Sequence, residues 1–426
     1  MRPSESLQRW FESSLRPRLQ RMVAKRRPDL PAPQLLIIAP GVRLSFGEVD
    51  RPFHTASAGK PFVAVAAARL AQQGLLSLDA PIGELAPGID LSALPAAPGV
   101  ILSRELTLSR LLSHRSGLPD PVQPPRGRST ECSLDRLMRQ PDRRWDLAEV
   151  VAQCAGLPSL GRPGESFAYG DTNYALAQCV LQAVTGLSAH EVLRTQVFQP
   201  AGMTRTGQPH STATDEELAG LKIAPVWVKG AEISHARALS VGSADGGAVT
   251  TLEDMVRFQE ALHEGDLLDR DLLARLARPR SRLRAGLHYG MGLATIRFGE
   301  FIPLVLRGLP EPVGGVGLWA VHSFFYPRPA RPRRHEPPQH CADAAQLRAA
   351  HRDRPSPGPL VLSRTPPLAD PRIGRALGCP WGPDLTRRQP TTVPSDGRAR
   401  RLRRGGRPAR RRCATAQPRH GCSAGW

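Results

Sequence analysis

Lysine is scarce in this chain of 426 residues: four positions hold it, against 54 arginines. The four are Lys25, Lys60, Lys222 and Lys229. An arginine can replace a lysine as a positive charge but not as a base, because the guanidinium group stays protonated in proteins. Each lysine is therefore a candidate for a chemical role that arginine cannot fill.

Cysteine pairs and long apolar runs are also missing. The seven cysteines are odd in number and widely spaced, and no C-x-x-C pair occurs. This pattern argues against a zinc cage and against a disulfide framework. The sequence contains no run of about 18 apolar residues, so we expect no membrane-spanning helix. Residues 1–30 also lack the apolar core of a secretory signal. We therefore expect a cytoplasmic protein that does not interact with membranes.

Acidic residues are few in the last part of the chain. Residues 328–426 hold 22 Arg, 6 acidic residues, 16 Pro and 9 Gly, whereas residues 1–327 hold 36 basic and 32 acidic residues. Because such a tail cannot bury a core, we expect it to be disordered. The Arg-rich run at 398–412 would bind phosphates only weakly and without sequence preference. We expect no specific nucleic-acid partner, since the rest of the chain is nearly neutral.

Hydrophobic periodicity divides the chain into an N-terminal basic helix or arm at 1–30, a main domain at 31–327 and the tail. Strands are expected in the main domain at 35–50, on both sides of the Pro40-Gly41 turn, and at 288–297 and 316–326. Helices are expected at 57–78, 106–119, 146–155, 172–185 and 250–263. The last of these is amphipathic, with Met255, Phe258 and Leu262 on one face.

The first strong helix begins with Ser57-Ala58-Gly59-Lys60, an S-x-x-K tetrad. A spacing of three residues places both side chains on one face of a helix. Pro61 fixes the start of that helix, so Ser57 lies at or beside its N-terminal end, where backbone N–H groups favour an oxyanion. If the pocket is apolar, the pKa of Lys60 falls and its amine can take the serine proton.

Six segments resemble motifs of the serine β-lactamase and penicillin-binding-protein superfamily, in particular its class C-like esterase and peptidase branch. Along the chain they follow one another in the same order as in that family. FHTASAGK at 53–60 is similar to F-x-x-A-S-x-x-K, and LTLSRLLSHRSGL at 106–118 to I-T-L-R-x-L-L-T-H-T-S-G-L. PGESFAYGDTNY at 163–174 is similar to P-G-x-x-F-x-Y-S-N-x-N-Y. The others are APIGEL at 80–85, PAGMTRT at 200–206 and DGGAVTTLED at 245–254, which resembles A-G-G-L-x-S-T-A-x-D-L.

The resemblance implies an α+β fold of the β-lactamase/transpeptidase type, with a central antiparallel sheet flanked by helices and an all-helical subdomain at about 80–240. It implies that Ser57 is the acylated nucleophile, that Lys60 orients and deprotonates it, and that Tyr169 is the general base or a proton relay. Asp171 stands where the family usually has Asn, and we expect it to contact Lys60 or the substrate. His114 belongs to a motif that closes a helix, so we expect a structural role. No metal or other cofactor is implied.

A third family motif, H/K-x-G on a strand beside the cleft, is matched only in part. The best match is Gly315-Val316-Gly317, which lacks the polar side chain of the first position but leaves the backbone N–H of Leu318 as a candidate oxyanion donor. An alternative uses the strand at 319–326 with His322. The sequence leaves both placements open.

The family pattern ends near Pro327, although members of the family continue with further strands and a C-terminal helix. We hypothesise that the reading frame shifts near residue 327, so that the main domain lacks its last strands and helix. The function implied by the resemblance is that of a serine hydrolase acting on a small-molecule ester or amide, as an esterase, D-aminopeptidase or carboxypeptidase-like enzyme. The alternative is a catalytically impaired pseudoenzyme or binding protein.

Overall fold

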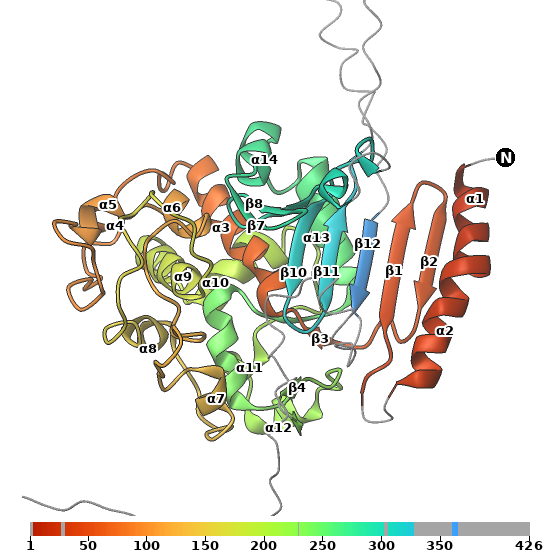
Figure 1. Cartoon of the computed structure of the whole chain (residues 1–426), viewed down its shortest axis with the longest axis horizontal. Coiled ribbons are helices and arrows are strands. Elements are labelled where there is room, and N and C mark those ends of the chain that lie inside the picture. Colours follow the sequence, from red (N-terminus) through yellow and green to blue (C-terminus); the bar gives the residue numbers. More distant parts are fainter. Residues whose placement is uncertain (1–2, 27–29, 229, 302–305, 328–359, 365–426) are drawn as a thin grey trace, which may run out of the picture. The chain divides into compact units, whose positions relative to one another are not determined.

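A central sheet of eight strands organises the part of the chain that the computed structural model describes, which is residues 3–26, 30–228, 230–301, 306–327 and 360–364. The strand order is β2-β1-β12-β11-β10-β9-β8-β7, and each strand is antiparallel to its neighbours (Figure 1). The strands are β1 (Gln34–Ala39), β2 (Val42–Phe46), β7 (Ser281–Arg284), β8 (Leu287–Tyr289), β9 (Ala294–Ile296), β10 (Val313–Gly317), β11 (Val321–Phe325) and β12 (Leu360–Arg364).

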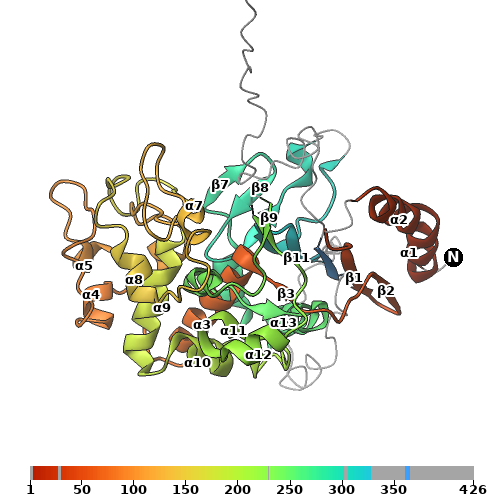
Figure 2. The ribbon, with the colours of Figure 1, turned by 90° about the horizontal axis from the view of Figure 1, so that it is seen from below.

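The predicted N-terminal helix covers one face of the β1–β2 hairpin. It comprises α1 (Pro3–Trp10), the π-helical turn η1 (Phe11–Leu15) and α2 (Arg16–Lys25), and it lies beside β1 and β2 (Figure 2). Side chains alternate across a strand, so Leu35 and Ile37 pack on these helices while Leu36 joins the main core on the other face. Strand β1 is therefore covered on both faces, whereas β2 buries Leu44 against the helices and leaves Arg43 and Ser45 exposed on its other face.

The helix predicted at 250–263 is present as α13 (Leu252–Glu264), which packs against β1, β11 and β12. The Thr251 hydroxyl accepts a hydrogen bond from the Asp254 N–H at 3.3 Å and caps its first turn, and Gly265 ends the helix at φ +96°. The helix predicted at 57–78 is divided. A 3-10 turn, η2 (Ala56–Gly59), precedes α3 (Lys60–Gln72), and Gly74 follows at φ +76°.

The regular elements between α3 and α13 are mostly helices, as expected for the subdomain at 80–240, and loops connect them. This region also contains a short hairpin, β4 (Trp227–Val228) and β5 (Ala231–Glu232), so it is not entirely helical as predicted. Its longest helix is α9 (Thr172–Thr185). The remaining helices are α4 (Ile82–Leu85), α5 (Leu102–Glu105), α6 (Leu108–Leu112), α7 (Leu134–Leu137), α8 (Leu147–Ala152), α10 (Ala189–Leu193), η3 (Arg194–Phe198), α11 (Pro209–Thr212), α12 (Asp215–Gly220) and η4 (Arg237–Asp245).

Four further elements complete the described part of the main domain. The small sheet formed by β3 (Phe53–His54) and β6 (Val249–Thr250) leads the chain into η2 and out of η4. Helix α14 (Arg270–Ala277) and the turn η5 (Phe298–Glu300) flank the strands β7 to β9 in the sequence. None of the helices within the described ranges is long and apolar enough to span a membrane.

The tail differs from the prediction at five residues. β12 lies between β11 and β1 and pairs with both, in registers that include Leu362 opposite Leu36 and Ser323. The prediction of a disordered tail, and of a sheet that lacks all its later strands, is therefore wrong for 360–364. The run Leu360-Val361-Leu362 is apolar enough to form a strand, although Arg and Pro surround it. The rest of the predicted disordered tail, including 398–412, lies outside the described residues.

Candidate active site

Ser57 and Lys60 lie on the same face of the turn that leads into α3. In a 3-10 turn, residues i and i+3 are eclipsed, and the Lys60 Nζ is 3.2 Å from the Ser57 Oγ. Only 1% of the Lys60 side chain is exposed. Pro61 occupies the first turn of α3, where its missing N–H leaves no hydrogen bond unmade. The structure thus brings together the two residues of the S-x-x-K tetrad.

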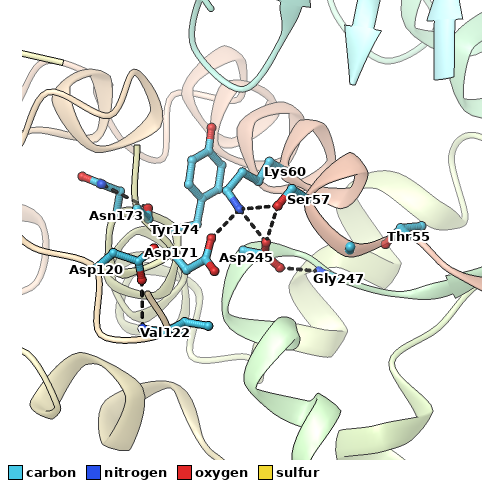
Figure 3. Close-up of polar contacts among 12 residues, drawn as sticks. Thr55, Ser57, Lys60, Asp120, Val122, Asp171, Asn173, Tyr174, Asp245 and Gly247 are labelled. Atoms are coloured by element: carbon cyan, nitrogen blue, oxygen red, sulfur yellow. Dashed lines mark hydrogen bonds and ion pairs between the residues drawn. The ribbon is translucent and has the colours of Figure 1, made fainter. Parts of the chain in front are cut away.

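Lys60 is held between two carboxylates (Figure 3). Its Nζ lies 2.7 Å from Asp171 Oδ1 and 2.5 Å from Asp245 Oδ2. Burial lowers the pKa of Lys60, but Asp171 and Asp245 outweigh this effect and hold the pKa well above the ordinary 10.5. The prediction of an apolar pocket that lowers the pKa of Lys60 is therefore wrong. The amine is an ammonium at neutral pH.

Asp171 is the residue that precedes α9, and the structure places it on Lys60, one of the two partners expected for it. A third carboxyl group, Asp120, lies nearby and is buried (Figure 3). Its Oδ1 accepts a hydrogen bond from the Val122 N–H at 2.9 Å. Burial, and then the charge of Asp171, raise the pKa of Asp120 to about 8. Acidic groups therefore outnumber lysines in this buried site.

Asp245 is the site residue that sequence reasoning missed. It is the last residue of η4. Its Oδ2 accepts a hydrogen bond from the Ser57 Oγ at 3.3 Å and also forms the ion pair with Lys60. Two glycines allow η4 to approach η2: a Cβ on Gly59 would lie 2.2 Å from the Gly246 carbonyl oxygen. The available signal was an acidic residue at the first position of a segment that otherwise resembles A-G-G.

Tyr169 comes from the loop before α9 and faces the same serine. The Lys60 Nζ is 4.9 Å from the centre of its ring. Burial raises the pKa of Tyr169 to about 12, although the Lys60 ammonium and a hydrogen bond with Ser57 lower it. Tyr169 is therefore a neutral phenol at neutral pH, next to the hydroxyl group of Ser57.

His114 packs against the loop that carries Tyr169. Its Nδ1 accepts a hydrogen bond from the Gly170 N–H at 3.3 Å, and its ring lies 4.2 Å from the ring of Tyr169. Burial, and then the charge of Lys60, hold its pKa well below the ordinary 6.5. A neutral, buried imidazole in this place holds the loop in position, which agrees with the structural role expected for it.

The strand packed against the Ser57 turn is β10, which carries Gly315 and Gly317. A Cβ on Gly317 would lie 2.2 Å from the Thr55 carbonyl oxygen, and one on Gly315 would lie 3.2 Å from the Pro61 Cγ. Leu318 follows in the turn to β11. His322, from the alternative placement, lies on β11 and is exposed. The structure therefore brings the Gly315–Gly317 segment next to Ser57.

Within the described residues, no group of three or more His, Cys, Asp or Glu side chains is arranged to hold a metal ion. The site consists of one hydroxyl, one ammonium, one phenol and several carboxyl groups. Such a set can carry out nucleophilic attack and proton transfer with protein groups alone.

Comparison with known proteins identifies the family of this chain. The family described as Beta-lactamase matches residues 45–332. Penicillin-binding protein 4* of Bacillus subtilis is 23% identical over 51% of this chain and 46% of its own length. The chain spans less than half the length of the first curated relatives that it matches.

Solved structures share the fold. A D-stereospecific amidohydrolase from Streptomyces sp. aligns with a TM-score of 0.58 at 22% identity, over 72% of this chain and 87% of its own. EstCE1, a hydrolase with promiscuous acyltransferase activity, aligns with a TM-score of 0.57 at 20% identity, over 83% and 93% of the two chains. The predicted fold and family are confirmed, and the chain belongs to the Beta-lactamase family, a family of hydrolases with the β-lactamase/transpeptidase-like fold.

Proposed function

We propose that the protein is a serine hydrolase that cleaves an ester or amide bond of a small molecule through an acyl-enzyme on Ser57. The observation that carries the proposal is the 3.2 Å contact between the Ser57 Oγ and the buried Lys60 Nζ. An ammonium at this distance lowers the free energy of the alkoxide that forms as the serine attacks a carbonyl carbon. Lys60 therefore orients Ser57 and stabilises its developing charge.

The reaction needs two proton transfers, one from Ser57 and one to the leaving group. Tyr169 serves the second: its neutral phenol, beside Ser57, donates a proton to the departing amine or alcohol. The phenolate that remains is stabilised by Lys60. Water then attacks the acyl-enzyme and releases the acid.

The oxyanion of the tetrahedral intermediate is held by backbone donors. We assign these to the N–H groups of Ser57 and Leu318, because β10 passes directly beside the Ser57 turn. Gly315 offers no side chain to the substrate, so the first position of the third motif contributes no charge to the site. We therefore expect substrates that have no carboxylate at the position facing Gly315.

The experiment exposes purified protein to a fluorophosphonate probe, and separately to the p-nitrophenyl esters and p-nitroanilides of D- and L-alanine. Wild type and Ser45→Ala, which changes an exposed serine on β2, are expected to be labelled to one equivalent and to turn over. Ser57→Ala is expected to lose labelling and on the order of 10³-fold or more in rate. Lys60→Arg keeps a charge but not the geometry and is also expected to be slow.

Two results would overturn the proposal. One is labelling that persists in Ser57→Ala. The other is well-folded wild-type protein that reacts with none of these compounds, which would instead favour the pseudoenzyme or binding-protein alternative.

A further inference from the structure

Two carboxylates stand where the motifs that this chain resembles have uncharged residues. Asp171 occupies the Asn position of Y-S-N, and Asp245 occupies the Ala position of A-G-G. The two come from different elements, the start of α9 and the end of η4, yet both contact the Lys60 Nζ (Figure 3). Lys60 therefore has no lone pair with which to accept the proton of Ser57, and another group must serve as the base.

Asp245 is placed to be that group. Its Oδ2 is 3.3 Å from the Ser57 Oγ, and because a carboxylate only accepts hydrogen bonds, the serine proton points at it. The Gly247 N–H donates to the other oxygen, Oδ1, at 3.3 Å and fixes the plane of the carboxylate. Only 6% of the Asp245 side chain is exposed. Asp171, by contrast, accepts a hydrogen bond from Lys60, and the hydrogen bond from Ser57 goes to Asp245.

We propose that Asp245 is the general base of this site, an inference that rests on the hydrolase function proposed above. As the Ser57 oxygen bonds to the substrate carbonyl carbon, its O–H bond breaks and the proton moves to Asp245 Oδ2. Tyr169 gives its proton to the leaving group as the bond from the carbonyl carbon to that group breaks. The proton on Asp245 then restores the phenol of Tyr169 by way of the Lys60 ammonium, so atoms and charge balance.

The surroundings of Asp245 favour this role. Burial raises the pKa of Asp245, as does Asp171, while Lys60 lowers it, and the pKa lies above its ordinary value. A carboxylate with a raised pKa is a better base at neutral pH. The titratable groups that face this centre from the elements packed around it are Lys60, Asp120, Asp171, His114, Tyr169, Tyr174 and Tyr289.

The test measures the rate of acylation by a p-nitrophenyl ester between pH 5 and 10, with full-length protein. Asp245→Asn keeps an acceptor oxygen for Ser57 and Lys60 but cannot take a proton. Its rate is expected to fall by on the order of 10²–10⁴-fold, and the acidic limb of the pH profile is expected to disappear. Asp171→Asn removes a charge from Lys60 but leaves the base, so it is expected to retain that limb and to lose less than tenfold.

Chemical rescue separates a base from a merely structural carboxylate. Asp245→Ala leaves space beside Ser57, and added formate is expected to restore part of the lost rate in proportion to its concentration. The double variant Asp171→Asn with Asp245→Ala frees Lys60 from both carboxylates. It is expected to regain activity relative to Asp245→Ala, with an optimum moved to higher pH as the released amine becomes the base.

The outcomes separate the two proposals. If Ser57→Ala is inert while Asp245→Asn reacts at the wild-type rate with its acidic limb intact, the role of Asp245 is overturned and the hydrolase function stands. If Ser57→Ala is still acylated, or wild type is not, the hydrolase function fails and the role of Asp245 fails with it. If Asp245→Asn does not fold, the double variant decides: no recovery, or an unchanged pH optimum, overturns the assignment.

Discussion

Asp120 shows at the scale of one residue what the crowding of carboxyl groups in the site does to the pKa of a buried aspartate. Burial and the nearby charge of Asp171 raise its pKa from 3.8 to about 8. The folded protein therefore binds more protons than the unfolded chain between about pH 4 and pH 8. The neutral Asp120 carboxyl group therefore stabilises the folded protein at low pH, and this contribution to the free energy of unfolding is lost as the pH rises through this window.

Asp120→Asn should remove this loss, because the amide is neutral at every pH and can still accept the hydrogen bond from Val122. The gain in unfolding free energy over wild type should grow by roughly 3–4 kcal/mol between pH 5 and pH 8. Urea denaturation at the two pH values measures it, with the exposed Asp142→Asn as control. A gain that is equal at both pH values would show that Asp120 is ionised throughout.

Residue-level prediction was strongest where the information is local. Ser57 and Lys60 are three positions apart, so the geometry of one turn was enough to place them together. The contact of Asp171 with Lys60 followed from its place in a motif. Asp245 reaches Lys60 across 185 positions of sequence, and no local pattern reveals that η4 returns to η2. The prediction for the pKa of Lys60 is wrong because the charges of Asp171 and of the missed Asp245 together outweigh the effect of burial.

At the scale of elements, the close contact between β10 and η2 determines the shape of the site. Gly317→Ala would place a Cβ 2.2 Å from the backbone oxygen of Thr55, so the strand or the turn must move. We expect a loss of about 1–3 kcal/mol of stability and slower labelling of Ser57, because the oxyanion donors shift. Urea midpoints and labelling rates measure both effects.

Gly315→Ala is the matched control for this strand. Its Cβ would meet the Cγ of Pro61 at 3.2 Å, a contact that a displacement of a few tenths of an ångström relieves. We expect it to remain closer to wild type than Gly317→Ala in both measurements. Equal losses in the two variants would mean that β10 does not approach Thr55 as closely as described.

Helices and strands were predicted well where neighbouring residues determine their ends, and less well where contacts with distant segments do. Helix α13 is predicted almost to the residue, because its hydrophobic period and the threonine that caps it are both local features of the sequence. The start of α3 was placed three residues early, since the 3-10 turn η2 depends on the packing of Gly59 against Gly246. The split of 316–326 into two strands required the register of β10 on β11.

At the scale of the whole sheet, β12 joins the β1–β2 hairpin to the strands that line the site. Its residues pair with β1 on one side and with β11 on the other. The sequence did not predict this strand, because five residues in an Arg/Pro-rich segment carry no sign of partners so far away in the chain. Without β12, both β1 and β11 would present an unpaired edge, and such edges promote aggregation.

Val361→Pro tests whether β12 completes the sheet. Val361 lies opposite Ile37 and Phe324, in the interior of the pairing. Proline has no N–H to donate to the ladder and is not tolerated in central strands. We expect at least about 1 kcal/mol of lost stability for the missing hydrogen bond, together with faster aggregation on heating.

Val361→Thr keeps the N–H and a β-branched side chain, so it should unfold and aggregate more nearly like wild type. Light scattering and urea denaturation compare the two variants, and indistinguishable behaviour would show that Leu360–Arg364 does not bridge β11 and β1.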